Sequence, residues 1–483
     1  MSLAPAILLW AAAGYGPVVV VAPEGPENAE TAWIGEAVAD ALPRALGQLS
    51  VAAVERADLR RAQEKLGMPG DPVTRATAIR MAEALGASRL VTGTFKPEDA
   101  NVTLSLRLLD VERATLSAPL IAAGPLTSLP ELIVSLAWDI ALAGSTRPGR
   151  SREEFLGIGR SVPFEAFRAY ASALAAPDPA SSAKLLRQAL ALQPAYDEAR
   201  LALGRLQVAT REYEAARESL KRIPPGAAVA RSARFIEGVA LLGLGRYAEA
   251  GELYASLVEQ GPTAAALNNR AIALLRLKAT TPRASAVLRR AVDLDPAAAD
   301  LPFNLAFALL VEGQSEASAF WLTTVVERDP MDVRAQVVLT WALRAAGREA
   351  QAEVTWRKVL DRSPSYESLA AVDVARRFEI VRDSEGPPLR EPDEQDEESR
   401  AASHLARARD LVAEDKADDA LAELSRAAYL EPTNPQVHLL MARVYRARGE
   451  TDKALASFRM SLWSQDDPAV RREMEGLGPA SNR

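Results

Sequence analysis

The sequence predicts a mainly α-helical solenoid preceded by a small α/β domain. Pro262, Pro296, Pro330 and Pro364 lie 34 residues apart, and Pro432 lies two such periods further on. Small residues recur at a fixed distance before these prolines, and β-branched runs alternate with helical patterns only near the amino end. A fixed period of this length is typical of stacked helical units, each burying its apolar face against its neighbours.

The small residues fix where each unit turns. Seventeen residues before the closing proline, or at the matching place in the last unit, stand Gly245, Ala279, Gly313, Gly347 and Gly449. Five residues later most units have alanine, where two helices cross closely: Ala216, Ala250, Ala284, Ala352, Ala420 and Ala454, with Ser318 as the exception. A small residue permits the tight reversal between helices.

Period and positions together resemble the tetratricopeptide repeat (TPR), a helix-turn-helix unit of 34 residues. We expect units at about 163–196, 197–230, 231–264, 265–298, 299–332 and 333–366, then 401–434 and 435–468. The resemblance implies a TPR α-solenoid superhelix with a concave surface.

The amino-terminal domain, 16–143, reads as a compact sheet with helices. We expect strands at Pro17–Ala22, Ser50–Val54 and Arg89–Phe95, then at 102–108 and Ala114–Ala122. We expect helices at 29–46, 56–66, 73–85 and 128–142. Leu104, Leu106 and Leu108 alternate with polar residues, which indicates a half-exposed strand in a hairpin.

This domain resembles the amino-terminal domain of TolB-like bacterial proteins. The resembling residues are VVVVAP at 18–23 with Glu27-Asn28, AWIGE at 32–36, LGA at 85–87, VTGT at 91–94 and LRLLD at 106–110. The usual Phe after the first strand's Pro is absent, and Thr-Gly after Asp110 is replaced by Glu112-Arg113-Ala114-Thr115. The resemblance implies a non-catalytic assembly or sensing module, often in cell-envelope proteins.

Residues 1–15 form an apolar tail or a signal peptide. Leu3–Ala13 is apolar and ends in small residues, as at a cleavage site, but lacks a basic flank because the first arginine is Arg44. It is too short to span a bilayer. We therefore expect a periplasmic or envelope location, with the cytoplasm as the alternative, and no integral membrane segment; sequencing the mature amino terminus separates the two locations.

Three further stretches fall outside the repeats. Residues 144–162 are rich in Gly, Ser, Arg and Pro and are expected to form a linker. Residues 367–400 are expected to form a degenerate repeat and an acidic linker, because Asp383–Ser399 carries eight acidic residues against Arg390 alone. Such a stretch is disordered or extended, either a solvated linker or an acidic tether for a basic partner. Residues 469–483 are a tail.

Composition argues against catalysis. The 483 residues include no cysteine and two histidines, and the formal net charge is −7. Thiol chemistry and cysteine-based metal sites are excluded, and a histidine triad or metal site is disfavoured. No phosphate-binding Gly-x4-Gly-Lys-Ser/Thr loop occurs, and no basic patch suggests nucleic acid. We expect no enzyme activity, catalytic residue, cofactor, metal or nucleic-acid partner.

The binding surface follows from position in the repeat. In TPR proteins, residues 5, 9 and 12 of the first helix face the groove. The family positions correspond to Arg205, Phe235, Val239, Asn269, Arg276, Phe303, Phe307, Trp341 and Arg344. An apolar stripe edged by arginine suits an extended peptide or an amphipathic helix. The alternative is that Phe303 and Phe307 pack within the array.

The leading functional hypothesis is a scaffold or adaptor that binds a protein or peptide partner in the TPR groove, as a subunit of an envelope complex. The alternative is a regulatory sensor whose α/β domain binds a small ligand and whose repeats relay the signal. Ligand-dependent melting of the α/β domain would separate them.

Overall fold

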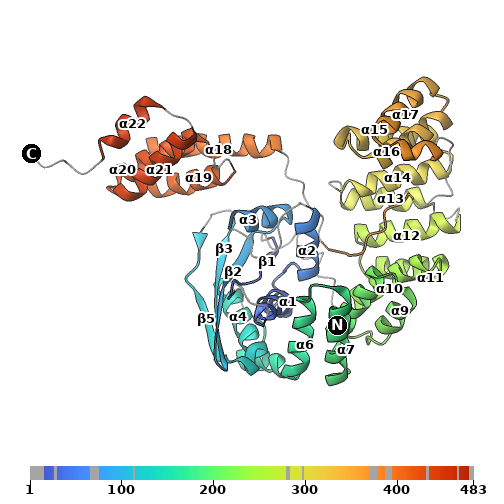
Figure 1. The fold of residues 1–483 in the computed structure, drawn as a ribbon, viewed down its shortest axis with the longest axis horizontal. Coiled ribbons are helices and arrows are strands. Elements are labelled where there is room, and N and C mark those ends of the chain that lie inside the picture. The colour runs from blue at the N-terminus through green and yellow to red at the C-terminus, as the bar shows by residue number, and fades with distance from the viewer. Residues whose placement is uncertain are drawn as a thin grey trace, which may run out of the picture.

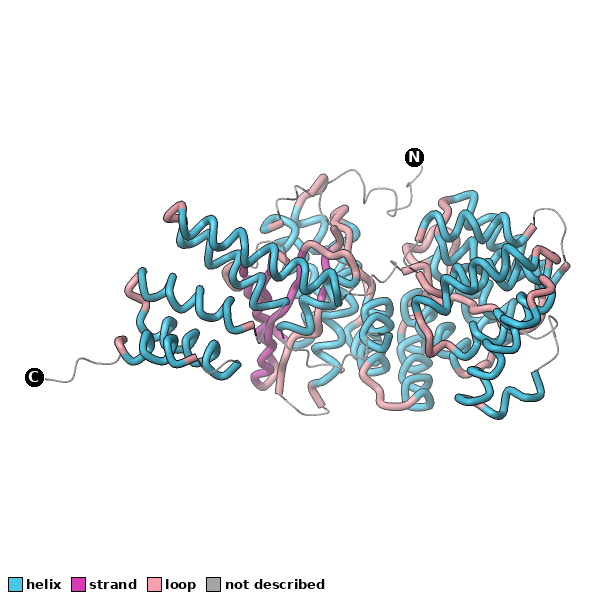
Figure 2. The backbone as a smooth tube through the Cα atoms, turned by 90° about the horizontal axis from the view of Figure 1, so that it is seen from above, coloured by secondary structure: helices cyan, strands magenta, loops and turns pink. Residues whose placement is uncertain are grey.

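In the computed structural model, the described residues are 16–26, 30–65, 75–111, 115–144, 146, 148–278, 283–295, 298–369, 378–386, 394–430, 434–464 and 467–477. An α/β domain lies at the centre of Figure 1, a curved array of paired helices lies to its right, and the carboxyl-terminal helices lie to its left. Figure 2 shows the same order along the long axis. The apolar run at residues 3–13 lies outside the described residues.

Five strands form the sheet of the amino-terminal domain: β1 (Val18–Val20), β2 (Arg89–Glu98), β3 (Asn101–Asp110), β4 (Thr115–Leu116) and β5 (Leu120–Pro125). β1 pairs parallel with β2, β2 and β3 form the expected hairpin, and β4 and β5 both pair with β3. The expected strand at Ser50–Val54 is reduced to a single bridge between Ala53 and Val18. The strand expected at Ala114–Ala122 is two strands, the second ending at Pro125.

Helices cover both faces of this sheet. α1 (Ala32–Gln48) and α4 (Leu129–Ala143) pack on one face, where alternate residues of β3 such as Leu104 and Leu106 are buried. α2 (Arg56–Lys65) and α3 (Arg75–Ala84) pack on the other, against Val19 and Leu90. Of the described residues, only Leu126–Ala143, which is α4 with the preceding turn η2 (Leu126–Ser128), is a helix long and apolar enough to cross a membrane. Its apolar face belongs to the domain core.

The expected linker at 144–162 is instead partly folded. α5 (Arg152–Leu156) and η3 (Gly157–Arg160) follow α4 directly. Phe155 is fully buried in the core of the α/β domain and lies 5.8 Å from the ring of Trp138. Ser151 and Glu154 form a capping box that starts α5. One buried aromatic residue therefore anchors a stretch whose composition resembles a loop.

Six pairs of antiparallel helices form the array. They are α6 (Phe164–Leu174) and α7 (Pro179–Leu192), α8 (Asp197–Ala209) and α9 (Tyr213–Leu220), α10 (Ala230–Gly243) and α11 (Tyr247–Gln260), α12 (Ala264–Leu277) and α13 (Ala284–Leu294), α14 (Asp300–Val311) and α15 (Ser315–Arg328), and α16 (Val333–Ala345) and α17 (Glu349–Arg362). η4 (Pro364–Leu369) follows. These pairs match the units expected from the 34-residue period.

The turn between paired helices needs a left-handed backbone. Gly245, Gly313, Gly347 and Gly449 have φ between +75° and +77°, a region that residues with a Cβ rarely adopt. The corresponding Ala279 lies outside the described residues, and the neighbouring Lys278 has φ of 53°.

The first repeat shares its core with the α/β domain. Phe167 and Ala171 of α6 belong to the same buried cluster as α1 and α4. The hydroxyl of Tyr170 donates a hydrogen bond of 2.9 Å to Asp40 of α1, which also pairs with Arg44. The domain and the array are therefore packed together through α1 and α6.

The carboxyl-terminal helices are α18 (Glu394–Ala413), α19 (Ala417–Leu430), α20 (Pro435–Ala447), α21 (Thr451–Ser464) and α22 (Pro468–Glu475). They form the two expected repeat units, and α22 is a further helix in the expected tail. α18 begins seven residues before the expected unit, inside the acidic stretch Asp383–Ser399. The expectation of a disordered or extended chain is therefore wrong from Glu394 onward. Acidic residues near a helix amino terminus are favoured by the helix dipole, which accounts for this earlier start.

Candidate functional site

An extended stretch of the chain lies across the first helices of the repeats. Residues 378–386, hereafter the groove segment, run past α16, α14, α12 and α10 and end beside α2 of the α/β domain (Figure 1). We call the surface of these four first helices that contacts the segment the groove face. The contacts fall into three groups: backbone, charged and aromatic.

Asparagines on the groove face bind the segment's backbone. The amide of Ile380 donates to Oδ1 of Asn304 at 2.8 Å, and its carbonyl accepts from Nδ2 of Asn304 at 2.8 Å and of Asn268 at 2.9 Å. Asn269 does the same for Arg382, accepting from its amide at 2.9 Å and donating to its carbonyl at 2.6 Å. A carboxamide that bonds both backbone groups of one residue recognises an extended chain independently of its side chains.

The asparagines are held in place from behind. All three are fully buried, and Asn304 donates to Oδ1 of Asn268 at 2.7 Å. Asn269 donates to the hydroxyl of Tyr254 at 3.0 Å, and Tyr254 donates to the carbonyl of Phe235 at 3.1 Å. Burial raises the pKa of Tyr254 far more than the hydrogen bond from Asn269 lowers it, so the hydroxyl stays protonated and can donate.

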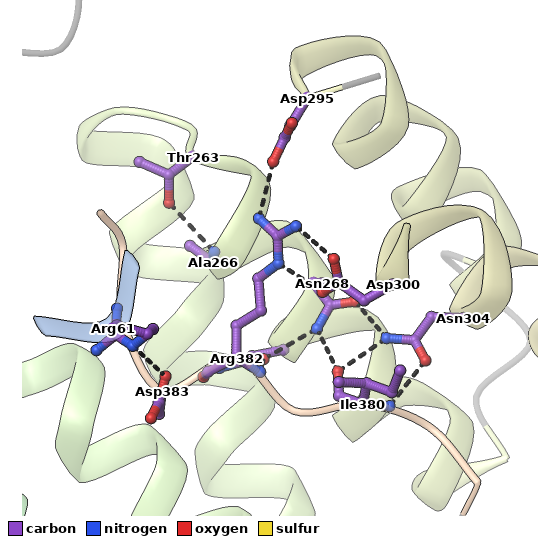
Figure 3. Close-up of polar contacts among 11 residues, drawn as sticks. Arg61, Thr263, Ala266, Asn268, Asp295, Asp300, Asn304, Ile380, Arg382 and Asp383 are labelled. Atoms are coloured by element: carbon purple, nitrogen blue, oxygen red, sulfur yellow. Dashed lines mark hydrogen bonds and ion pairs between the residues drawn. The ribbon is translucent and has the colours of Figure 1, made fainter. Parts of the chain in front are cut away.

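A basic and an acidic site lie on either side of Ile380. Arg276 of α12 binds the carboxylate of Glu379, whose side chain is only 2% exposed. Arg382 of the segment forms two parallel bonds of 2.7 Å to Asp300 and one of 3.1 Å to Asp295, as Figure 3 shows. A two-bond arginine–carboxylate contact fixes direction as well as charge.

A second basic site receives Glu385. Arg231 of α10 donates to both of its carboxylate oxygens, at 2.9 and 2.7 Å. Thr263, the N-cap residue of α12, donates its hydroxyl to the same carboxylate at 2.7 Å. Glu385 belongs to the acidic stretch for which we expect either a solvated linker or an acidic tether for a basic partner. The solvated reading is wrong at Glu385, because an arginine and a hydroxyl of the array bind its carboxylate.

Aromatic residues receive the other end of the segment. The ring of Phe378 lies 5.1 Å from Trp341, edge to face, and 6.1 Å from Phe307. Phe378 and Ile380 both pack against the buried cluster that contains these two residues. The segment is therefore held by apolar contacts at one end and by charges along the rest.

The segment ends against the α/β domain. The hydroxyl of Ser384 donates to Asp58 of α2 at 2.6 Å, and Arg61 pairs with Asp383 at 3.2 Å. Gly386 lies so close to Asp58 that a Cβ there would stand 2.4 Å from the carboxyl carbon. The same nine residues thus contact both the array and the domain that precedes it.

The structure places the sequence-predicted residues in three ways. Asn269, Arg276, Phe307 and Trp341 contact the groove segment. Phe303, Phe235 and Val239 are buried within the array, Phe235 against Tyr254 at 5.5 Å. Arg205 pairs with Glu55 of the α/β domain, and Arg344 pairs with Glu349 and lies over the ring of Trp356. Of the residues predicted to face the groove, some therefore contact the segment, some are buried in the core, and some pair with other side chains.

Sequence reasoning missed six further residues that contact the groove segment: Asn268, Asn304, Thr263, Arg231, Asp295 and Asp300. A signal for the asparagines was present. Asparagine is a poor helix former, yet three occur well inside α12 and α14, 35 and 36 residues apart across the two units. Polar residues with low helix propensity at buried positions indicate a specific partner for the side chain.

Family comparison supports the repeats directly. Two tetratricopeptide-repeat family models match the sequence, one at residues 173–235 and 411–472 and the other at 226–265 and 237–299. The chain contains tetratricopeptide repeats. The matched TPR ranges include α10 and α12 of the groove face and most of the carboxyl-terminal helices. They do not reach the α/β domain, so its likeness to TolB-like proteins stays a prediction.

Solved TPR structures are similar to parts of the chain. YrrB, described as a TPR protein with an unusual peptide-binding site, is 19% identical over 39% of this chain and 96% of its own, with a TM-score of 0.33. MamA from Desulfovibrio magneticus RS-1 is 21% identical over 38% and 97%, with a TM-score of 0.32. A tetratricopeptide repeat protein from Parabacteroides merdae is 16% identical over 58% and 98%, with a TM-score of 0.32. No curated protein sequence matches this chain as a relative.

The described part of the chain holds no group of three or more His, Asp or Glu side chains that could bind a metal. The array instead presents amide groups, two arginines, two aspartates and two aromatic rings to the groove segment. This arrangement is suited to binding an extended peptide.

Proposed function

We propose that this protein is a scaffold whose TPR array binds an extended segment of a partner protein on the groove face. The observation that carries the proposal is the double hydrogen bonding of Asn304 to Ile380 and of Asn269 to Arg382. Ile380 and Arg382, which have one residue between them, are each bound through both their amide and their carbonyl groups. Such a pattern fits a strand-like peptide and is not met by a helix, whose backbone groups bond internally.

The chemistry of the groove face defines the partner's segment. Arg276 and Arg231 each bind a carboxylate, Asp295 and Asp300 together bind a guanidinium, and Trp341 with Phe307 contacts an aromatic ring. The partner's segment therefore carries two acidic positions, one basic position and one aromatic position.

The envelope location belongs to the same proposal. Its support is the apolar run Leu3–Ala13, which ends in small residues, and the order of TolB-like motifs in the first domain. An adaptor there would use the α/β domain for assembly and the TPR groove to bind the partner.

The test is partner recovery from cells of the source organism with the full chain. In-cell crosslinking and mass spectrometry compare two proteins that both carry Phe378→Ala and Arg382→Ala, one of which also carries Asn269→Ala and Asn304→Ala. The two shared substitutions weaken the groove segment, so its own loss of the asparagine bonds does not offset the partner's loss. We expect the main crosslinked partners to fall at least about tenfold, because each asparagine substitution removes two backbone bonds of about 1 kcal/mol each.

Phe320→Ala in the same background is the matched control. Phe320 lies on the second helix α15 and is 68% exposed, so a partner bound to the groove face does not depend on it. Equal recovery with the asparagine variant and with this control would reject the groove face as the binding surface. Melting curves of all three proteins establish that they are folded.

A further inference from the structure

We propose that the groove segment is a built-in competitor: it occupies the site that a partner uses, and the partner's segment carries the same pattern of side chains. That pattern is an aromatic residue, an acid at the next position, arginine four positions after the aromatic and an acid seven positions after it, as at Phe378, Glu379, Arg382 and Glu385. This inference rests on the proposed function and adds the partner's chemistry and its regulation.

The segment is bound as a ligand is bound. It has no regular secondary structure, and backbone and side-chain contacts alternate along it. Val381, between the two residues held by asparagine, is 38% exposed. Only Phe378 and Ile380 of the segment pack against an apolar cluster. Departure of the segment therefore uncovers apolar surface only where Phe378 and Ile380 lie against that cluster.

Departure leaves the groove face intact. The side chains of Asn268, Asn269 and Asn304 lie beneath the segment, and water can replace it as their partner. The aspartates that bind Arg382 would likewise be hydrated. The array's own helix contacts do not pass through the segment. The bound and released states therefore differ mainly in these reversible polar contacts and in the aromatic contact of Phe378.

Covalent connection makes the segment a strong competitor. It follows Leu369 by eight intervening residues and precedes Glu394 by seven. Short tethers give effective concentrations on the order of millimolar. A partner with the same contacts binds only those molecules from which the segment has left. Its apparent affinity is therefore its intrinsic affinity multiplied by the fraction of such molecules.

Displacement also reaches the α/β domain. Ser384 and Asp383 bind Asp58 and Arg61 of α2, so a partner that replaces the segment releases this contact as well. Asp383 is 67% exposed, and an exposed ion pair contributes little. The array therefore contributes most of the binding energy of the segment. The contact with α2 is present only while the segment is bound.

The experiment measures binding of a fluorescein-labelled peptide of sequence FEIVRDSEG to the full chain by fluorescence anisotropy. The native protein is compared with the double variant Phe378→Ala, Arg382→Ala, which weakens the segment and leaves every groove-face residue unchanged. We expect the variant to bind the peptide at least about tenfold more tightly than the native protein. Val381→Ala is the matched control within the segment, and we expect native affinity for it.

The other possible results distinguish failure of the competitor proposal from failure of the proposed function. Equal affinity of native protein and double variant would overturn the competitor and leave the proposed function standing. No saturable binding to either would overturn the groove face as a peptide site, and with it the proposed function. Light scattering of the native chain tests whether the segment binds within one molecule. If the chain is a dimer and its affinity for the peptide rises on dilution, the segment binds in the groove of a second copy. That result would overturn the proposal that the segment competes within its own molecule.

Discussion

Trp341→Ala should lower the unfolding free energy of the array by about 3–5 kcal/mol, the usual cost of removing a large buried aromatic side chain. Trp341 is fully buried in the cluster that joins α14, α15, α16 and α17, and its indole also contacts Phe378 of the groove segment. The substitution leaves a cavity between repeats and removes the ring that contacts Phe378. We expect both lower stability and weaker retention of the segment.

Urea unfolding followed by circular dichroism measures this effect. α16 packs against α15 of the preceding unit and against α17 of its own unit, so a cavity at α16 weakens both of these helix contacts. Phe320→Ala, also an aromatic truncation, is the control, and its 68% exposure predicts a change within about 0.5 kcal/mol. Equal midpoints for the two variants would show that Trp341 does not hold the array together.

Arg382→Asp should expel the groove segment. The change places a third carboxylate beside Asp295 and Asp300, which now share one guanidinium. All three side chains are less than a fifth exposed, so repulsion is weakly screened. Breaking a buried ion pair by removing one partner costs about 3–5 kcal/mol, although release of the segment into water limits the loss of global stability.

A double-mutant cycle identifies the cause. Asp300→Arg in the Arg382→Asp background restores an opposite-charge pair, so we expect the thermal midpoint of the double variant to recover most of what each single variant loses. The measurement is thermal unfolding of all four proteins at the same ionic strength. Additive losses would mean that residues 382 and 300 do not interact.

The repeats could be predicted because they are local and periodic. The proline spacing places every helix pair from α6 to α17 to within a few residues. The left-handed turn is set by position more strongly than by residue type: Arg211 and Asp415 occupy it, with φ of 63° and 60°, in two of the units that lack glycine there. Packing against the neighbouring repeats offsets the backbone strain of a residue with a Cβ in this left-handed conformation.

The groove segment could not be predicted because its partners are distant in sequence. Arg276 lies 103 residues from Glu379, and Arg231 lies 154 residues from Glu385. Composition describes only the neighbours along the chain, and around Asp383 these are acidic and rich in proline. Charge compensation by arginines on earlier repeats is a property of the folded array. The predicted residues Asn269, Phe307 and Trp341 were found by repeat position, whereas their contact with residues 378–386 required the structure.

The burial of Phe303 is also a feature that repeat position did not predict. Its repeat position predicts a groove-facing side chain, but it is 1% exposed in the cluster shared by α14 and α16. Asn304, the next residue, contacts the segment instead. Neighbouring residues of a helix point in directions about 100° apart. The 34-residue period alone does not determine which of the two faces the groove.

Amide hydrogen exchange at single-residue resolution in the native full chain tests the central claim most directly. The amides of Ile380 and Arg382 donate to Asn304 and Asn269, whereas the amide of Val381 has no acceptor within the described part of the chain. After correction for intrinsic rates, we expect Ile380 and Arg382 to exchange at least about tenfold more slowly than Val381. Equal, unprotected exchange at all three amides would contradict the binding of the segment on the groove face.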